Sequence, residues 1–472
     1  MSRKTNLLLG LPLCLILAGC SMAPDYQQPQ TGTATAWPVS GPDTGTGAGV
    51  AADIAWQDFF RDPVMRDLIG RALTNNADLA VATANVERAR ALYRVQRADQ
   101  LPTVAAGAGA TRQGTPAASS PTGNSTVGSQ YQVNAGVTAF ELDFFGRVRS
   151  LSDAALQSYF ATAEAQRSAR LSLIAEVANA YLTLLTDRSL LKLTEDTLKA
   201  QQESYDLIKL AYDRGARTQL ELRQAQTTLD TARANMALYR RQVAQDVNAL
   251  TLLVGEPVDG GAALLAAADD AYVIRDLPAG LPSDLLLRRP DILQAEHQLR
   301  AANANIGAAR AAFFPSISLT SSIGTLSGSL SGLFESGTKA WSVGSSASLP
   351  IFDFGRNSAN LEVAKAERDA AVAQYQGAVR TAFREVADEL VARETLSDQL
   401  SALTSLVEAT QETFDLSQAR YDRGVDNYLT VLDSQRALYT AQQQQLQVRL
   451  QRLTNLVTLY KALGGGTAGE GA

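Results

Sequence analysis

The stretch that decides the fold is residues 357–421, which read NSANLEVAKAERDAAVAQYQGAVRTAFREVADELVARETLSDQLSALTSLVEATQETFDLSQARY. It contains no proline and a single glycine, Gly377, so nothing in it forces a helix to end. Its apolar positions repeat about every 3.5 residues, the period of a coiled coil. These positions are Leu361, Ala364, Ala371, Tyr375, Val379, Ala382, Val386, Leu390, Leu396, Leu400, Leu403, Val407 and Phe414. The pattern predicts one helix of about 65 residues, which at 1.5 Å per residue reaches roughly 100 Å.

The same pattern occurs earlier in the chain, over 148–212, because the sequence is duplicated. Three motifs recur with an offset of 209 residues: Phe145-Gly146-Arg147 with Phe354-Gly355-Arg356, Tyr212-Asp213-Arg214-Gly215 with Tyr421-Asp422-Arg423-Gly424, and Gly255 with Gly464. Nearer the start of each repeat the offset is 213, since Asp78 matches Asp291 and Pro102 matches Pro315. Each half is therefore expected to hold a long helix, a left-handed glycine turn and a returning helix, over 148–254 and 357–463.

A two-residue alternation precedes each long helix and predicts strands. The first repeat is expected to have strands at 103–110 and 130–140 around a loop at 111–129. The second is expected to have a strand from 316, a loop at 324–340 and a strand at 341–352. Small polar side chains form one face: Gln132, Asn134, Thr138, Ser316, Ser318, Thr320 and Ser322. Strands of about ten residues with one apolar face are long enough to cross a membrane.

Four strands cannot close a barrel, and a sheet in a membrane cannot leave its edges open. Two copies of the chain would supply eight strands, whose interior is filled by side chains, and three copies would supply twelve, which leave a lumen. The small polar side chains suit a water-filled bore and favour the trimer. The alternative is a soluble β-ribbon carried on a coiled coil.

The N-terminus has the features of a targeting segment. Arg3 and Lys4 precede an apolar stretch, 7–18, that is too short to span a bilayer. Leu17-Ala18-Gly19-Cys20 resembles the bacterial lipoprotein cleavage box. The resemblance implies cleavage before Cys20, lipid attachment to Cys20 and, with serine at position 21, sorting to the outer membrane. An ordinary signal peptide with an incidental cysteine is the alternative.

The remaining segments follow from composition. We expect a signal peptide at 1–19, an N-terminal tether or wrapping segment at 20–61, and repeat 1 at 62–255, beginning with helical patterning from Asp62-Pro63 to about residue 100. A link follows at 256–285, in which Ala271-Tyr272-Val273-Ile274 resembles a strand. Repeat 2 is expected at 286–464 and a C-terminal tail at 465–472, with Gly464-Gly465-Gly466 following the last helix.

The sequence offers little for catalysis or for nucleic acid. A net charge of −6 argues against a nucleic-acid partner. The two cysteines, Cys14 and Cys20, lie in the N-terminal segment, and the one histidine, His297, has no second ligand nearby in the sequence, so a surface role is expected for it and no metal site or cofactor is predicted. No nucleophile and base pattern is present, and the chain is not expected to be an enzyme.

Several ordered motifs resemble the outer-membrane lipoprotein branch of the TolC-like efflux channels, of the NodT type. They are Trp56-Gln57-Asp58-Phe59-Phe60, Leu287-Arg288-Arg289-Pro290-Asp291-Ile292, Ile306-Gly307-Ala308-Ala309-Arg310-Ala311, Phe313-Phe314-Pro315, Phe354-Gly355-Arg356 and Tyr421-Asp422-Arg423-Gly424-Val425-Asp426-Asn427-Tyr428-Leu429. The resemblance covers 20–465. It implies a homotrimer in which a 12-stranded membrane β-barrel joins a 12-helix coiled-coil tunnel through a mixed α/β equatorial belt.

The resemblance also implies partners and site residues. The partners are a periplasmic adaptor and an inner-membrane pump of the resistance-nodulation-division class. The turns would contact the adaptor through Tyr212, Arg214, Gly215, Tyr421, Arg423 and Gly424. The Arg and Asp of each turn can bond across it or meet a neighbour. The alternative is a plain helix connection whose Tyr packs and whose charges are solvated, and both descriptions can hold together.

The same resemblance places a gate at Leu429 and Asp433, which the i, i+4 spacing stacks on one helix face. Repeat 1 has Leu220 and Gln224 at these places, so the carboxylate is confined to one helix per chain. The branch named for TolC itself has Asp at the position of Thr430 and Arg at that of Asp426, and a latch built on those groups does not transfer to this chain.

These features together predict a passive, gated exit duct for drugs or other small solutes, anchored in the outer membrane by lipid and extending into the periplasm. Two alternatives stay open: a structural coiled-coil lipoprotein without a channel, and a duct for metal ions or proteins. The four methionines do not favour copper or silver as cargo. The sequence does not identify the pump, the cargo or the trigger of opening.

Overall fold

The computed structural model describes residues 21–30, 32, 37, 51–119, 123–258, 272–274, 277 and 288–466. Cys20 lies outside these residues, as does most of the predicted 256–285 link. The chain divides into two compact units. Unit 1 comprises Met1–Gln30, Asn85–Thr162 and Gln294–Tyr375, and unit 2 comprises Thr31–Ala84, Ala163–Leu293 and Gln376–Ala472. Each unit therefore draws residues from both sequence repeats.

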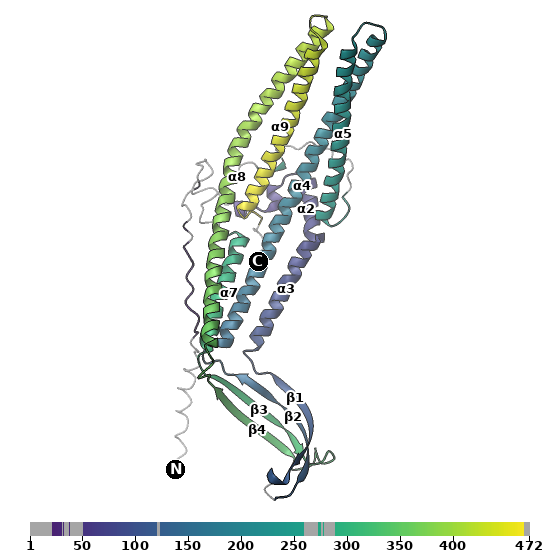
Figure 1. The fold of residues 1–472 in the computed structure, drawn as a ribbon. Helices are drawn as coiled ribbons and strands as arrows, with labels where there is room; N and C mark the ends of the chain where they lie inside the picture. The colour runs from purple at the N-terminus through teal and green to yellow at the C-terminus, as the bar shows by residue number, and fades with distance from the viewer. Residues whose placement is uncertain are drawn as a thin grey trace. The chain divides into compact units, whose positions relative to one another are not determined.

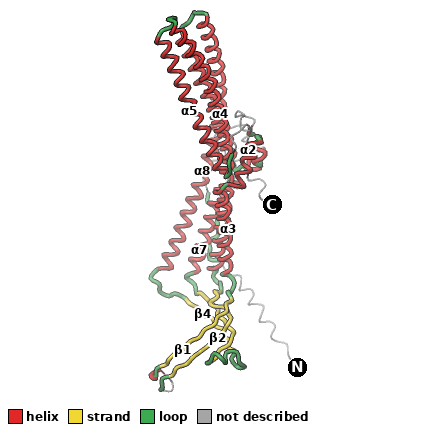
Figure 2. Tube along the Cα trace, turned by 90° about the vertical axis from the view of Figure 1, so that its right-hand side faces the viewer, coloured by secondary structure: helices red, strands yellow, loops and turns green. Residues whose placement is uncertain are grey.

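Unit 1 contains one antiparallel sheet of four strands in the order β1-β2-β3-β4 (Figures 1 and 2). The strands are β1 Val104–Thr115, β2 Thr126–Glu141, β3 Ser316–Ser327 and β4 Lys339–Ser348, and a short 3-10 helix, η2 Ala117–Ser119, follows β1. β1 and β4 are edge strands, each with one neighbour. The edges of the sheet are thus open in the single chain.

Five expected strand ends were wrong. β1 and β2 stay paired out to Thr115 and Thr126, so the predicted loop at 111–129 is much shorter. Likewise β3 continues to Ser327 and β4 begins at Lys339, which shortens the loop predicted at 324–340. β4 ends at Ser348 and not at residue 352, because Pro350 has no N–H to donate to a strand ladder. The strand ends near the hairpin loops carry polar residues that break the apolar alternation, so the sequence pattern predicted strands that are too short there.

The two faces of the sheet differ as the alternation predicts. One face pairs small polar residues: Ser318 opposite Ser346, Ser322 opposite Ser342, Asn134 opposite Gly107 and Gln132 opposite Gly109. The other face, which we call the apolar face, carries Val104, Val133, Val137, Ile317, Leu319, Ile323, Trp341 and Val343. Ile323, Trp341 and Val343 are exposed in the single chain, as expected for side chains that face lipid.

Strand β2 bends at a β-bulge. The register shifts by one residue between Val137 and Phe140, and Ala139 adopts a positive φ of 51°. Near the bulge, Gly136 and Gly324 lie on the polar face where strands approach closely. A Cβ on Gly136 would stand 2.0 Å from the carbonyl oxygen of Ser321, and one on Gly324 would stand 2.1 Å from that of Val133. The crowding marks the polar face as the inner side of the bend.

The described N-terminal residues of unit 1 wrap onto a helix and do not form a free tether. Helix α7, Pro290–Ala311, donates side-chain hydrogen bonds from Arg310 to the carbonyl oxygen of Met22 (3.1 Å) and from Asn303 to that of Pro24 (2.7 Å). The Tyr26 hydroxyl donates to Glu296 at 3.2 Å. The first residues after Cys20 are thereby held against α7.

Two long helical hairpins, α4 with α5 and α8 with α9, lie mostly in unit 2, and α4 and α8 each begin in unit 1 (Figure 1). The helices are α4 Arg147–Asp213, α5 Gln219–Val254, α8 Arg356–Asp422 and α9 Tyr428–Ala462. Their ends agree with the expected ranges to within a few residues, because each end is marked by a glycine turn. The thirteen predicted seam positions of α8 are also confirmed, since eight of them are buried and none is exposed.

The helix expected over residues 62–100 is two helices, α2 Pro63–Asn75 and α3 Ala77–Ala98. Asp62 caps α2 by accepting from the backbone N–H groups of Val64 and Met65. Asn76 interrupts the run with an extended backbone (φ −66°, ψ 127°), and its Oδ1 accepts from Leu79 N–H to start α3. The prediction of one helix was wrong because Asn76 ends α2 and caps α3 within a run whose apolar residues keep a continuous helical period.

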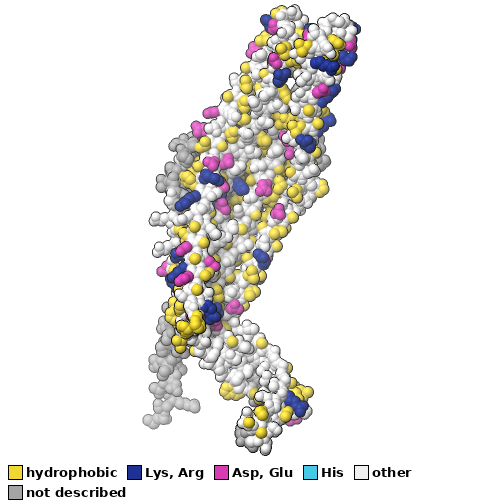
Figure 3. All heavy atoms as spheres, in the orientation of Figure 1, with side chains coloured by type: hydrophobic (Ala, Val, Ile, Leu, Met, Phe, Trp, Pro, Cys, Tyr) yellow, Lys and Arg dark blue, Asp and Glu magenta, His cyan; other side chains and the backbone are white. Residues whose placement is uncertain are grey.

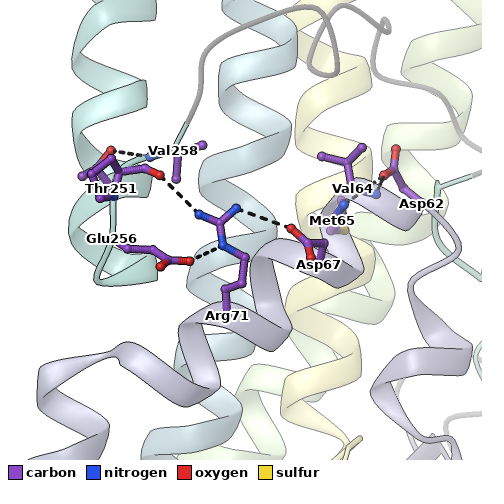
Figure 4. Close-up of polar contacts among 9 residues, drawn as sticks. Asp62, Val64, Met65, Asp67, Arg71, Thr251, Glu256 and Val258 are labelled. Atoms are coloured by element: carbon purple, nitrogen blue, oxygen red, sulfur yellow. Dashed lines mark hydrogen bonds and ion pairs between the residues drawn. The ribbon is translucent and has the colours of Figure 1, made fainter.

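Helix α2 is fastened to the end of α5 by Arg71 (Figure 4). The Arg71 guanidinium bonds to the Glu256 carboxylate, donates to the carbonyl oxygen of Pro257 at 3.2 Å and lies 3.4 Å from Asp67. Thr251 accepts a hydrogen bond from Val258 N–H at 3.4 Å. These contacts hold the first residues of the 256–285 link against α2.

Asn76 and Arg289 occupy matching places in the two repeats and make matching contacts. Asn76 Nδ2 donates to the carbonyl oxygen of Leu253 near the end of α5, and Arg289 Nη1 donates to that of Ala462 at the end of α9, both at 2.9 Å. Arg289 is buried and also binds Asp291 (3.0 Å) and Glu385 (2.8 Å). The Arg289 side chain thus links α7, α8 and α9, whereas the Asn76 side chain links α3 and α5.

Two further features differ from expectation. Gly465 and Gly466, predicted as part of a tail, are buried against Tyr460 and Trp56, and Gly466 N–H donates to Ile54 O at 3.3 Å. Of the predicted strand at 271–274, the described residues form one antiparallel bridge, Phe60 with Val273. Short helices also occur at η1 Ala51–Asp53 and α1 Trp56–Phe59.

Within the described part of the chain, no helix combines the length and the apolar character needed to cross a membrane.

The glycine geometry predicts a difference between two strand positions. Gly136→Ala should destabilise the protein by about 1–3 kcal/mol, because the new methyl group overlaps the backbone of β3. Gly344→Ala on β4 is the matched control, since a Cβ there has nothing within 4 Å. Thermal unfolding of both purified variants in detergent checks this, and equal melting temperatures would contradict it.

Candidate functional site

Both hairpin turns end their long helix in the same way. Gly215 and Gly424 each have a φ of 72°, which glycine adopts without steric cost. Gly215 N–H donates to Tyr212 O and Ala216 N–H donates to Ala211 O, both at 2.8 Å. The second turn repeats this pair of bonds, which is the Schellman pattern. The turn glycines are therefore required by the backbone, whatever binds there.

The charged groups of the two Tyr-Asp-Arg-Gly turns do not bond across the turn, which was one of the expected possibilities. Asp213 bonds back along its own helix to Lys209 at 2.9 Å, and Asp422 accepts from Gln418 at 2.8 Å. Arg214 and Arg423 are exposed and form no ion pair with another described residue. Tyr212 is 36% exposed. These three side chains point to solvent and are available to a partner.

A different ion pair braces the second turn. Arg420 donates two hydrogen bonds to the Asp426 carboxylate, at 2.7 and 3.0 Å. The pairing lowers the pKa of Asp426 and raises the pKa of Arg420. Repeat 1 has Ala211 and Arg217 at these places and lacks the pair. The sequence contains a signal for this ion pair, namely opposite charges six residues apart around a glycine turn, but the pair was not predicted.

Arg217 instead links the two turns. Its guanidinium lies 5.1 Å from the ring centre of Tyr421, a cation–π contact, and bonds to Glu221 at 3.0 Å. Glu221 also completes a capping box with Thr218 at the start of α5. Tyr421 is therefore partly buried between the hairpins, unlike its counterpart Tyr212. The two predicted contact tyrosines are not equivalent.

An apolar cluster lies just behind the turns. It consists of Ile208, Ala225, Tyr428, Val431 and Leu432, from α4, α5 and α9. Three side-chain hydrogen bonds then follow α4 and α9 away from it: Ser204 with Tyr428 (2.7 Å), Gln201 with Gln435 (2.7 Å) and Thr194 with Tyr439 (2.8 Å). Helix α9 is thus bound to the first hairpin as well as to its own.

Leu429 and Asp433 lie on the opposite face of α9 from this cluster. Their neighbours Val431 and Leu432 are buried, whereas Leu429 is 44% exposed and the Asp433 side chain is 60% exposed. Arg436 is 3.5 Å from the Asp433 carboxylate. The matching Leu220 of repeat 1 is exposed too. Both predicted gate side chains are therefore exposed in the single chain.

Two carboxylates meet between α4 and α5. Asp187 and Asp246 are hydrogen-bonded to each other, and one oxygen of Asp246 is buried without another partner. Burial and the neighbouring charge of Asp187 raise the pKa of Asp246 to about 7. Two close carboxyl groups cannot both ionise cheaply, so the pair retains a proton near neutral pH.

The structure offers no further chemistry at His297. Its Nδ1 lies 2.7 Å from Gln157 Oε1 and its ring packs near Phe160, so the residue is half-buried, not on the open surface as expected. Burial lowers the pKa of His297. Within the residues that the structure describes, no group of three or more His, Cys, Asp or Glu side chains is arranged to hold a metal ion.

Comparison with known proteins identifies close relatives. The family model described as "Outer membrane efflux protein" matches residues 68–256 and 281–465. The chain is 50% identical over 459 residues to the solvent efflux pump outer membrane protein SrpC of Pseudomonas putida, covering 96% of each chain. It is 48% identical over 468 residues to the antibiotic efflux pump outer membrane protein ArpC of the same species, covering 98% of this chain and 96% of the relative.

A solved structure shares the fold. The open state of the MtrE outer membrane channel of Neisseria gonorrhoeae superposes with a TM-score of 0.86 at 42% identity, covering 95% of this chain and 99% of that one.

The acid pair predicts how stability depends on pH. The folded pKa of Asp246 lies above the ordinary value of 3.8, so the folded state binds more protons and loses stability as pH rises from about 4 to about 7. Asp246→Asn should flatten this loss and raise the melting temperature at pH 8 more than at pH 5. Asp230→Asn, an exposed acid on the same helix, is the control. Equal pH profiles for wild type and Asp246→Asn would contradict the prediction.

Proposed function

The chain belongs to the outer membrane efflux protein family, and on that premise we propose that it forms the gated outer-membrane duct of a tripartite efflux pump. The open edges of a sheet with one apolar and one polar face carry the proposal. Unpaired backbone groups cannot stay in hydrocarbon, so β1 and β4 must pair with other copies. Three copies give twelve strands, enough to enclose water.

The exposed apolar side chains of the helices support the same assembly. Leu207, Leu210, Leu252, Leu406 and Leu416 are exposed on α4, α5 and α8 of the single chain. Scattered exposed leucines are ordinary, but a series along coiled-coil helices is typical of contacts with further helices. In a trimer, four helices per chain would build a tunnel of twelve.

The gate is proposed at Leu429 and Asp433. Both side chains are exposed, one turn apart, on the face of α9 that points away from the apolar cluster. Three copies of Leu429 would form a constriction that excludes water, and three copies of Asp433 a ring that attracts cations. The Asp433 charge is opposed in part by Arg436, 3.5 Å away.

The turns are proposed as the contact surface for a periplasmic adaptor, which would join this duct to an inner-membrane pump of the resistance-nodulation-division class. Tyr212, Arg214 and Arg423 offer an exposed aromatic ring and two cations at the ends of the hairpins. Tyr421 contributes indirectly, because Arg217 covers its ring. Gly215 and Gly424 shape the turns and make no contact through side chains.

Lipid attachment to Cys20 would add an anchor, and no other cofactor is proposed. The bonds of α7 to Met22 and Pro24 support this, since they hold the residues after Cys20 in a defined place. Acyl chains contribute about 0.8 kcal/mol per buried CH₂, so two or more chains give stable attachment.

Small organic solutes are the proposed cargo. The relatives named for solvent and antibiotic efflux cover nearly the whole chain, which favours drugs and solvents over metal ions or proteins. A structural lipoprotein without a channel would not need an inward polar sheet face. The duct itself is proposed to be passive, and to take its energy from the pump.

Gate variants test the duct. Leu429→Ala and Asp433→Ala should each raise the single-channel conductance of purified trimers in a planar bilayer, because each replaces a larger side chain with a methyl group at the proposed constriction. Leu220→Ala, at the matching place in repeat 1, serves as the comparison and should have a smaller effect. Absence of current in wild type and in all three variants would reject the duct.

A deletion strain tests the cargo. Loss of the gene should increase susceptibility to organic solvents and to amphiphilic antibiotics, and the wild-type gene supplied in trans should restore resistance. Increased susceptibility to copper or silver alone would instead favour metal-ion export.

A further inference from the structure

The polar face of the sheet in unit 1 is uncharged along nearly its whole length. Strands β1 to β4 contain three charged residues, Arg112, Glu141 and Lys339. Arg112 pairs with Ser129 and Lys339 pairs with Thr325, which are register positions of the apolar face. Both cations therefore point away from the polar face.

Glu141 is the one charged strand residue on the polar side, opposite Ser318 after the bulge. Arg147 neutralises it through two hydrogen bonds, one of 2.8 Å to Glu141 Oε1. On the side of the sheet that Figure 3 shows, charged side chains gather at the hairpin end and leave the middle of the sheet without them. The charge on the strands thus lies at the sheet ends or on the apolar face.

Hydroxyl groups on the polar face are also paired with each other. Ser318 Oγ and Ser346 Oγ lie 2.8 Å apart, as do Ser322 Oγ and Ser342 Oγ. The pairs alternate with glycines, for example Gly344 opposite Thr320. Such a surface carries dipoles of hydroxyl and amide groups but, apart from Glu141, no charged strand residue. It is also the inner side of the bend marked by Gly136 and Gly324.

We infer that the barrel section of the duct is an electrically neutral passage that admits cationic, anionic and uncharged organic solutes alike. The inference rests on the proposed trimer, in which the polar face lines the bore. A charged wall concentrates ions of one sign, and its effect falls with salt. A wall without net charge lacks that bias, so selection by charge is left to the helical section, where Asp433 lies.

Cysteine reactivity measures the potential at this wall directly. The two native cysteines are both in the N-terminal segment, so Ser346→Cys places one reporter thiol on the polar face. Its modification by cationic and anionic methanethiosulfonate reagents is timed in lipid nanodiscs, and each rate is divided by that of a free thiol. The normalised cation-to-anion ratio should stay within about twofold of one at low and high salt.

Matched variants make the assay decisive. Ser318→Asp, directly opposite the reporter, should raise the ratio several-fold at low salt, and Ser318→Asn should not. If the aspartate variant fails to assemble, Ser322→Asp with Ser342→Cys repeats the design one pair further along. Val343→Cys, on the apolar face and 66% exposed in the single chain, should be protected by lipid from both reagents.

Three outcomes of the cysteine assay would overturn parts of this proposal. A ratio above about fivefold at Ser346→Cys without an added charge, decreasing with salt, overturns the neutral passage. A reactive Val343→Cys with a protected Ser346→Cys overturns the assignment of faces. A ratio near one in trimers that carry no current leaves the neutral face standing and rejects the proposed duct.

Discussion

Backbone hydrogen bonding at the edges of the sheet is the constraint on which the rest of the structure depends. The four-stranded sheet satisfies its inner ladders but leaves β1 and β4 with one neighbour each. An outer-membrane protein cannot leave these groups in hydrocarbon, so the fold is incomplete as a single chain. Apolar residues of the helices are likewise exposed in the single chain, as are Leu429 and Asp433.

The duplication gives two similar hairpins. The symmetry between them is broken at equivalent positions that hold different residues. Asn76 and Arg289 reach matching carbonyl groups, but Arg289 also holds Glu385 of α8. The pair Arg420 and Asp426 braces one turn, whereas Arg217 of the other turn lies over Tyr421. Asp433 of α9, with Gln224 at the matching place in α5, is a further difference between the two hairpins.

Local patterns predicted much of this architecture. The long helices were predictable because glycine turns mark their ends and the seam of α8 has a coiled-coil period. Shorter features were missed for identifiable reasons. Asn76 breaks a run that looks continuous, strand pairing extends through polar residues to Thr115 and Thr126, and Gly465 is buried because Tyr460 packs on it. Each depends on a specific contact that the order of apolar and polar residues does not record.

The sequence by itself determined the repeat, the helix lengths and the alternation of the strands, because these depend on the order and spacing of residues. Leu429 and Asp433 came instead from the resemblance to a channel family, and their role at a gate stays a prediction. Only the tertiary structure decided which side chains are exposed and which are paired with other side chains. It partly buries Tyr421 beneath Arg217 while exposing Tyr212, pairs Asp187 with Asp246, and turns Arg112 and Lys339 away from the polar face. Such choices depend on packing between segments that are far apart in the chain, which local periodicity does not record.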